Sequence, residues 1–191
     1  MVDDVKLSVQ DRDLLGRLSL YFNNVQLHLK EGEGWLIFNA NRQRGGRVTR
    51  FIAESLAEYR PLISSYFMLW RDFALNSYLV NVELTAKDPT EVVDPRLARE
   101  YRIADRVSQD MYYHMLYSDL FVLSGVAPAH LHEATYLDSV VAERQRRKLA
   151  SILITPRSLE ALVADYQALD PSGRIWKSFF DRLYETSLIA V

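Results

Sequence analysis

The sequence predicts an α/β fold in three layers, with helices on both faces of a mostly parallel five-stranded sheet. Five short apolar runs, rich in β-branched and aromatic residues, have the pattern of strands buried on both faces, and segments with helical spacing separate them. Only seven Gly and six Pro occur in 191 residues, and no Pro/Ser/Gly-rich linker interrupts the chain. We therefore expect one domain over 1–191, made of a helical lead-in at 1–32 and an α/β core at 33–191.

The first elements are a helix and a strand. Over residues 7–29 the apolar side chains are dense enough for a helix that packs on the edge of the first strand. These side chains are Leu14, Leu15, Leu18, Leu20, Phe22, Val25 and Leu27. The first strand is expected at 35–38, and the spacing of Val48, Ile52 and Leu56 predicts the helix that follows it.

The later elements repeat this alternation. Strands are expected at 65–69, 120–123, 151–154 and 187–191, and Leu137, Val140 and Val141 predict a helix before the fourth strand. Strand and helix in alternation favour right-handed crossovers. Residues 85–94, with Pro89 inside the segment and Pro95 after it, are the best candidate for a long exposed loop.

Composition excludes several function classes. The 23 basic and 25 acidic residues give a net charge of −2, which argues against a protein that coats polyanions but leaves local patches open. Without cysteine the chain has no disulfide, no thiolate nucleophile and no Cys-ligated zinc. No run approaches the ~20 apolar residues that cross a bilayer, and the acidic start lacks the pattern of a signal peptide. A cytoplasmic protein without a membrane partner is expected.

The turn after the first strand carries the main candidate site. Gly45 and Gly46 stand between the strand and a helix, as in a P-loop, where backbone N–H groups and a helix N-terminus hold phosphates. The glycines are surrounded by four arginines, namely Arg42, Arg44, Arg47 and Arg50. This clustering predicts a site for phosphate, a nucleic-acid backbone or an acidic partner. The alternative is a solvated basic loop without a ligand.

Four segments, in order, resemble one family. Residues 21–38 resemble the approach to the P-loop of AAA+ ATPases of the bacterial helicase-loader type (DnaC/DnaI) and of the related IstB transposition ATPases. Residues 117–126 are similar to their Walker B strand, and 146–162 to their sensor-1 strand and next helix. Residues 178–185 resemble the segment that carries their trans-acting arginine. The resemblance spans roughly residues 21–191 and implies a P-loop NTPase core.

The P-loop of that family is incomplete in this sequence. A working P-loop ends in Gly-Lys-Ser/Thr, in which the Lys reaches the phosphates and the hydroxyl binds Mg²⁺. These last two positions fall on Gly45 and Gly46 in an ungapped alignment, or on Arg47 and Val48 with a two-residue insertion. Thr49 stands one residue late, which turns its side chain by about 100° around the helix axis.

Other hydrolytic residues implied by the resemblance are missing too. Ser124 and Gly125 replace the acidic pair after the Walker B strand, and Asp119 stands too early to substitute. Pro156 replaces the polar sensor, although Thr155 beside it still has a hydroxyl. These losses predict an AAA+-like protein that binds or regulates without hydrolysing ATP, so that neither ATP nor Mg²⁺ is an expected cofactor.

The resemblance also implies partners. A degenerate subunit would associate with an active ATPase or another component of replication or transposition machinery, as a homo- or hetero-oligomer, and DNA is a second candidate partner. Arg182 matches the trans-acting position and would complete a neighbour's active site. The alternative for Arg182 is a surface ion pair with Asp181 or Glu185.

Two rival functions remain at this point. One is a divergent but active NTPase that uses Arg47 in place of the lysine and Glu54 or Asp119 as the acid. The other is an α/β interaction module that needs no nucleotide. The first requires a divalent metal and nucleotide, whereas the second requires neither.

Three further clusters have ordinary structural explanations. Arg144, Arg146, Arg147 and Lys148 could contact DNA, but cations at a helix end are favourable in themselves and are usually solvated. His130, His132 and Glu133 lack a separated further ligand for a metal ion. The last cluster is aromatic and could stack on bases, although core packing is the favoured interpretation. It consists of Tyr112, Tyr113, Tyr117 and Phe121.

Overall fold

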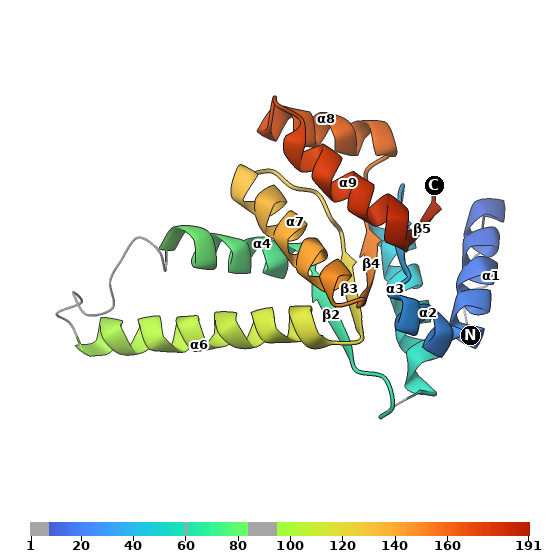
Figure 1. Cartoon of the computed structure of the whole chain (residues 1–191), viewed down its shortest axis with the longest axis horizontal. Coiled ribbons are helices and arrows are strands. Elements are labelled where there is room, and N and C mark those ends of the chain that lie inside the picture. Colours follow the sequence, from blue (N-terminus) through green and yellow to red (C-terminus); the bar gives the residue numbers. More distant parts are fainter. Residues whose placement is uncertain (1–7, 60, 84–94) are drawn as a thin grey trace.

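The computed structural model describes residues 8–59, 61–83 and 95–191, and a five-stranded sheet forms its centre (Figure 1). The strands are β1 (Gly34–Ile37), β2 (Ser65–Leu69), β3 (Leu120–Ser124), β4 (Ala150–Ile154) and β5 (Ser187–Ala190). They lie in the order β2-β3-β4-β1-β5, and every neighbouring pair is parallel. The predicted α/β fold is confirmed, and each strand ends within one residue of its expected bounds.

One face of the sheet is covered by α1 (Val9–Asn23), α2 (Val25–Glu31) and α3 (Arg42–Ala57). The single helix expected over 7–29 is wrong, because Asn24 ends α1 and begins α2. Leu20 and Leu27, expected in the apolar face, are 66% and 61% exposed. The remaining apolar residues of α1 pack with α3 on the face of β1, around Trp35 and Ile37.

The opposite face is covered by the later helices. These are α4 (Trp70–Tyr78), the π-helix η1 (Leu79–Glu83), α6 (Pro95–Tyr117), α7 (Leu131–Arg146), α8 (Leu159–Leu169) and α9 (Arg174–Thr186). Because side chains alternate along a strand, Leu36 and Phe38 enter this second core while Trp35 and Ile37 enter the first. Burial on both faces explains why the strands are continuous apolar runs in the sequence.

Gly34 shows how closely β1 approaches β4. A Cβ at this position would lie 1.9 Å from the carbonyl oxygen of Ser151, so that only glycine fits without moving the backbone. The loop expected at 85–94 lies outside the described residues. Within the described part of the chain, no helix is both long and apolar enough to span a bilayer.

The sheet order determines where a ligand would bind. The chain leaves β1, which lies between β4 and β5, passes through α3 and returns at the far edge in β2. In parallel sheets, ligands bind beyond the carboxyl ends of the strands where such a change of direction opens a crevice. The candidate site should therefore lie beyond Ile37, next to the ends of β3 and β4.

Candidate functional site

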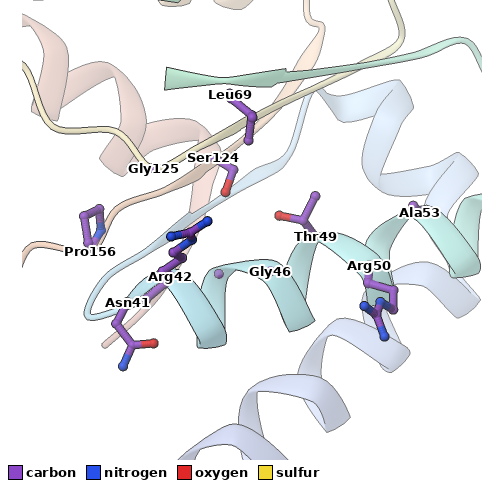
Figure 2. A pocket seen from close by; sticks show the side chains of 12 residues that line it. Asn41, Arg42, Gly46, Thr49, Arg50, Ala53, Leu69, Ser124, Gly125 and Pro156 are labelled. Atoms are coloured by element: carbon purple, nitrogen blue, oxygen red, sulfur yellow. The ribbon is translucent and has the colours of Figure 1, made fainter. Parts of the chain in front are cut away.

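A cavity of about 560 Å³ opens at this edge, between α3 and the ends of β2, β3 and β4 (Figure 2). Small residues of α3 form one wall, namely Gly45, Gly46, Thr49 and Ala53. The strand ends form the other wall with Leu69, Ser124, Gly125 and Pro156. Arg42 and Arg50 also border the cavity, so the structure brings four of the six predicted site residues to it: Arg42, Gly45, Gly46 and Arg50.

The turn from β1 to α3 is short. β1 ends at Ile37 and α3 already begins at Arg42, with Asn41 as its N-cap. Asn39, in this turn, adopts a left-handed conformation with φ 54°. Gly45 and Gly46, which an ungapped alignment places at the Lys and Ser/Thr of a P-loop, therefore lie in the first turns of a helix rather than after an open loop.

The backbone N–H groups of this turn already have acceptors within the protein. The N–H groups of Asn39 and Ala40 donate to the carbonyl oxygens of Arg157 and Thr155, both at 2.9 Å. The Asn41 side chain accepts from the N–H groups of Gln43 (3.1 Å) and Arg44 (3.0 Å), and the Asn41 carbonyl accepts from Gly45 (2.7 Å). A P-loop instead offers such donors to phosphate. In this turn, the same N–H groups donate to acceptors within the protein.

Arg44 and Arg47 turn away from the cavity toward α1. Arg44 Nε lies 3.0 Å from Asp11 Oδ1, and an Arg47 terminal nitrogen donates to Asp11 Oδ2 at 2.6 Å. Arg44 is only 8% exposed and also donates to the carbonyl oxygens of Phe38 and Asn39, both at 3.3 Å. Asp11 therefore binds two of the four predicted anion-binding arginines.

Arg42 and Arg50 are exposed but differ in direction (Figure 2). The Arg42 guanidinium group reaches toward Ser124 across the cavity, whereas the Arg50 side chain points away along the outer side of α3. The Ser124 hydroxyl points toward the cavity. Thr49 also borders the cavity, but its Oγ1 is shielded from solvent and has no hydrogen-bond partner in the structure.

The acids that could assist hydrolysis lie elsewhere. Asp119 precedes β3, at the opposite edge of the sheet, where its Oδ2 accepts from the hydroxyl (2.7 Å) and N–H (2.8 Å) of Ser64. Glu54 is exposed on α3 and does not border the cavity. Thr155 is fully buried and its hydroxyl donates to the carbonyl of Val126 at 2.6 Å.

These residues do not fit Mg²⁺-ATP. Among the described residues that line the cavity there is no carboxylate, and its polar side chains belong to Asn41, Arg42, Thr49, Arg50 and Ser124. Mg²⁺ at a nucleotide site is bound by carboxylates together with the phosphates and a P-loop hydroxyl. The arrangement can attract an anion, but it offers a metal ion no charged ligand.

Arg182, the predicted trans-acting residue, pairs within its own chain. Its side chain on α9 is 31% exposed and forms an ion pair with Asp138 on α7. Ser178 Oγ also lies 3.4 Å from both carboxylate oxygens of Asp138. The expected surface partners Asp181 and Glu185 are therefore not the ones that the structure shows.

The basic run at 144–148 is not a uniform surface, and for Arg144 the expectation of a DNA-facing or solvated side chain is wrong. Arg144 is 1% exposed, and its guanidinium donates to Ser151 Oγ (2.9 Å) and to the carbonyl oxygens of Met115 (2.6 Å), Ser118 (3.0 Å) and Ala150. Burial lowers the pKa of Arg144 to about 9, which leaves it charged at neutral pH.

The other members of this run lie at the surface. Arg146 and Arg147 each bind Glu143 Oε1 at 2.6 Å, and these hydrogen bonds lower the pKa of Glu143 to about 2. Arg147 also lies over the ring of Tyr117, 4.4 Å from its centre. These cations are held on the surface by neighbouring side chains.

The members of the aromatic cluster also differ in burial, and the histidine cluster is not a metal site. Phe121 is in the core as expected, but the three tyrosines are 40–57% exposed, so core packing is wrong for Tyr112, Tyr113 and Tyr117. His130 and His132 stack on each other at the start of α7. In the part of the chain that the structure describes, no group of three or more residues could hold a metal ion.

Comparison with known proteins identifies the fold. No protein-family model matches the sequence, and no curated protein matches it. The structure is similar to the crystal structure of the DnaC helicase loader, with a TM-score of 0.63 and 15% sequence identity. The match covers 97% of this chain and 91% of the DnaC chain. The fold with its five-stranded parallel sheet in the order β2-β3-β4-β1-β5 thus resembles that of the DnaC helicase loader, as expected from the sequence.

Proposed function

We propose that this chain is an AAA+-like subunit that does not hydrolyse ATP and serves as a binding or regulatory partner of an active ATPase. The observation that carries the proposal is the closed turn after β1. The N–H groups of residues 39, 40, 43, 44 and 45 have protein acceptors between 2.7 and 3.1 Å away. Freeing them for phosphate would cost the N-cap of α3, which is typically worth about 1 kcal/mol, and the backbone hydrogen bonds of Asn39 and Ala40.

The missing charges support the same conclusion. Gly45 and Gly46 stand where the Lys and the Mg²⁺-binding hydroxyl would be, and Ser124 and Gly125 stand where the acidic pair would be. The rival use of Arg47 as a lysine substitute meets an obstacle, because Asp11 holds its guanidinium 2.6 Å away on the side of α1. A guanidinium is also a poor replacement for a compact ammonium ion in a phosphate cradle.

The partner class comes from the fold. Because the chain shares the fold of a helicase loader, we propose that its partner is an AAA+ protein or another component of a replication or transposition assembly. Arg182 is the residue proposed to act on that partner. Its partly exposed position on α9 would let it leave Asp138 and reach a neighbouring active site, as arginine fingers do.

The test is Mg²⁺-dependent ATP turnover by the purified chain and by Arg47→Ala. We expect both proteins to show only background turnover. Turnover by the wild type that is lost in Arg47→Ala would contradict the proposal and favour the active-NTPase alternative.

The role of Arg182 is tested by adding the chain to a candidate AAA+ ATPase. Stimulation by the wild type should be lost with Arg182→Ala but kept with Arg174→Ala, a change of the same charge at an exposed position of the same helix. Equal stimulation by the wild type and Arg182→Ala would remove Arg182 from the interaction.

A further inference from the structure

Helix α6 (Pro95–Tyr117) carries a set of exposed side chains along one side. In Figure 1, much of α6 extends beyond the strands of the sheet, and its main neighbours are α7 and η1. Ser108, Met111 and Met115 are buried or half-buried and mark its inner side. Because a helix turns by about 100° per residue, six exposed residues lie on the outer side. They are Arg99, Ile103, Arg106, Asp110, Tyr113 and Tyr117, and we call them the α6 stripe.

Large, mainly apolar side chains are exposed on and beside the stripe. Ile103 and Tyr113 are 55% and 57% exposed, and Val107, next to the stripe, is 51% exposed. The rings of Tyr113 and Tyr117 stack with their centres 4.5 Å apart, so that these two side chains are already ordered. Ordered tyrosines beside aliphatic side chains are typical of protein–protein contacts, because they bury a large area at little cost in conformational entropy.

The stripe residues follow one another at alternating steps of four and three positions. Such spacing keeps a line of side chains facing a second helix, as in a two-stranded coiled coil. If two copies of α6 pack antiparallel about a two-fold axis through the middle of the stripe, each contact occurs twice, because the same surface serves both copies. Ile103 then meets Tyr113 of the second copy, and Arg106 meets Asp110. Val107 lies close to the axis.

Charge complementarity favours this antiparallel arrangement. The N-terminal half of the stripe carries Arg99 and Arg106, and the C-terminal half carries Asp110 and the two tyrosines. A parallel pair would bring Arg106 to Arg106 and Asp110 to Asp110, and like charges in contact are unfavourable. Within one chain the Asp110 side chain is 73% exposed, and its Oδ2 lies 3.8 Å from His114 Nε2, beyond hydrogen-bond distance. Asp110 can therefore turn to a second chain.

We propose that this chain forms a homodimer in which the α6 stripes of two copies pack antiparallel. Two ion pairs between Arg106 and Asp110 flank the two-fold axis, and Ile103 packs against Tyr113 on either side of them. One helix from each copy makes a small interface, so the dimer is reversible and dissociates in the micromolar range. It goes beyond the proposed function, since it requires neither nucleotide nor Arg182.

Sedimentation equilibrium across the micromolar range tests the dimer. The wild type should approach twice the mass of one chain. Arg106→Glu brings like charges together with Asp110 of the second copy, and Asp110→Lys does so with Arg106, so that each variant alone should dimerise roughly tenfold more weakly or worse. An equal mixture of the two variants should recover wild-type affinity, because a mixed dimer has opposite charges at both contacts. Contacts within one chain cannot produce this rescue.

Asp105→Lys is the matched control for Asp110→Lys. Both aspartates are exposed on α6, but five residues place them about 140° apart around the helix axis. The control should dimerise within about twofold of the wild type, since an exposed charge outside the contact is screened. Equal losses in the two variants would reduce the effect to net charge and overturn the inference. A wild type that stays monomeric, or a mixture without rescue, would do the same.

Disulfide trapping tests the register, because the chain has no cysteine of its own. In the antiparallel dimer, position 103 meets position 113 of the second copy, whereas the two 103 positions lie about 15 Å apart along the helices. A disulfide requires Cα atoms within about 7 Å of each other. Ile103→Cys and Tyr113→Cys should therefore form disulfide-linked dimers when mixed and not when alone. Efficient cross-linking of either variant alone would overturn the antiparallel arrangement.

The two proposals fail separately. Mg²⁺-dependent ATP turnover would overturn the proposed function and leave the dimer standing. A monomeric wild type without turnover would leave the proposed function intact and remove only the dimer. Thermal unfolding of each variant near the wild-type temperature confirms that a lost dimer does not reflect a lost fold.

Discussion

The two basic runs of this chain, residues 42–50 and 144–148, look alike in sequence and behave differently in the structure. Each contains four cations, yet Arg144 lies in the core with four hydrogen bonds, whereas Arg146 and Arg147 bind Glu143 at the surface. In the first run, helical spacing turns Arg44 and Arg47 to Asp11 while Arg42 faces the cavity. The density of charge in a sequence therefore does not define a binding surface. Whether a charged side chain is buried, paired or free to meet a ligand depends on the elements that pack around it.

The largest loss of stability is expected on replacement of Arg144. Replacing Arg144 with Met leaves the carbonyl oxygens of Met115, Ser118 and Ala150 without their buried donor. We expect a loss of about 3–5 kcal/mol in the free energy of unfolding, because each buried acceptor left without a hydrogen bond costs about 1–3 kcal/mol. Denaturant unfolding measures it. Arg146→Met, at a largely exposed side chain, is the control, and equal effects of the two changes would contradict the contrast.

The next largest loss of stability is expected on replacement of Asp11, which binds Arg44 and Arg47 of the first run. Asp11→Ala leaves Arg44 almost buried beside no carboxylate, and we expect a loss of about 1–3 kcal/mol. Asp13→Ala, at an exposed position of the same helix, should change the unfolding free energy by less than about 0.5 kcal/mol. If Asp13→Ala destabilises as much, then Asp11 acts through the charge of α1 rather than through Arg44 and Arg47.

A smaller effect is expected for the pair between α7 and α9. The side chains of Arg182 and Asp138 are 31% and 22% exposed, so that solvent weakens their attraction. A double-mutant cycle with Arg182→Gln and Asp138→Asn should give a coupling energy of up to about 1 kcal/mol. A value above roughly 3 kcal/mol would mark the pair as a structural bond that Arg182 does not leave, which contradicts its proposed action on a partner.

The smallest effect concerns Glu143, the surface counterpart of Asp11. Its hydrogen bonds to Arg146 and Arg147 lower its pKa from 4.5 to about 2. Because the folded pKa lies below the unfolded value, the stabilisation is complete above pH 4.5 and is lost as the pH falls toward 2. Carboxyl NMR should show this midpoint, and the combined Arg146→Ala and Arg147→Ala changes should raise it. A midpoint that these changes leave in place would contradict the assigned cause.

Much of the fold could be predicted because its strands are buried on both faces. Continuous apolar runs such as 120–123 have few other places in a folded domain. The break between α1 and α2 had only a weak signal in the sequence. Asn24 can end a helix, but it stands in a segment with helical spacing on both sides, and neither Gly nor Pro marks the end of α1. Burial of Arg144 was hidden, since two of its acceptors are backbone carbonyl groups 26 and 29 residues away.

One feature of the candidate site could be predicted from the sequence, namely the absence of the residue types that a working P-loop requires. That no Gly-Lys-Ser/Thr sequence follows the first strand is visible in the sequence alone. The closure of the turn had a weaker signal, because Asn41 directly before a helix is a favoured N-cap. The role of Asp11 had no local signal, since 36 residues separate it from Arg47.

The central claim is that the turn after β1 no longer binds nucleotide as a P-loop does. An equilibrium titration of a fluorescent ATP analogue, with and without Mg²⁺, tests it on the wild type and on Arg47→Ala. We predict no Mg²⁺-dependent binding at micromolar nucleotide in either protein. Micromolar, Mg²⁺-dependent binding by the wild type that disappears in Arg47→Ala would contradict the account and favour the alternative of a divergent NTPase.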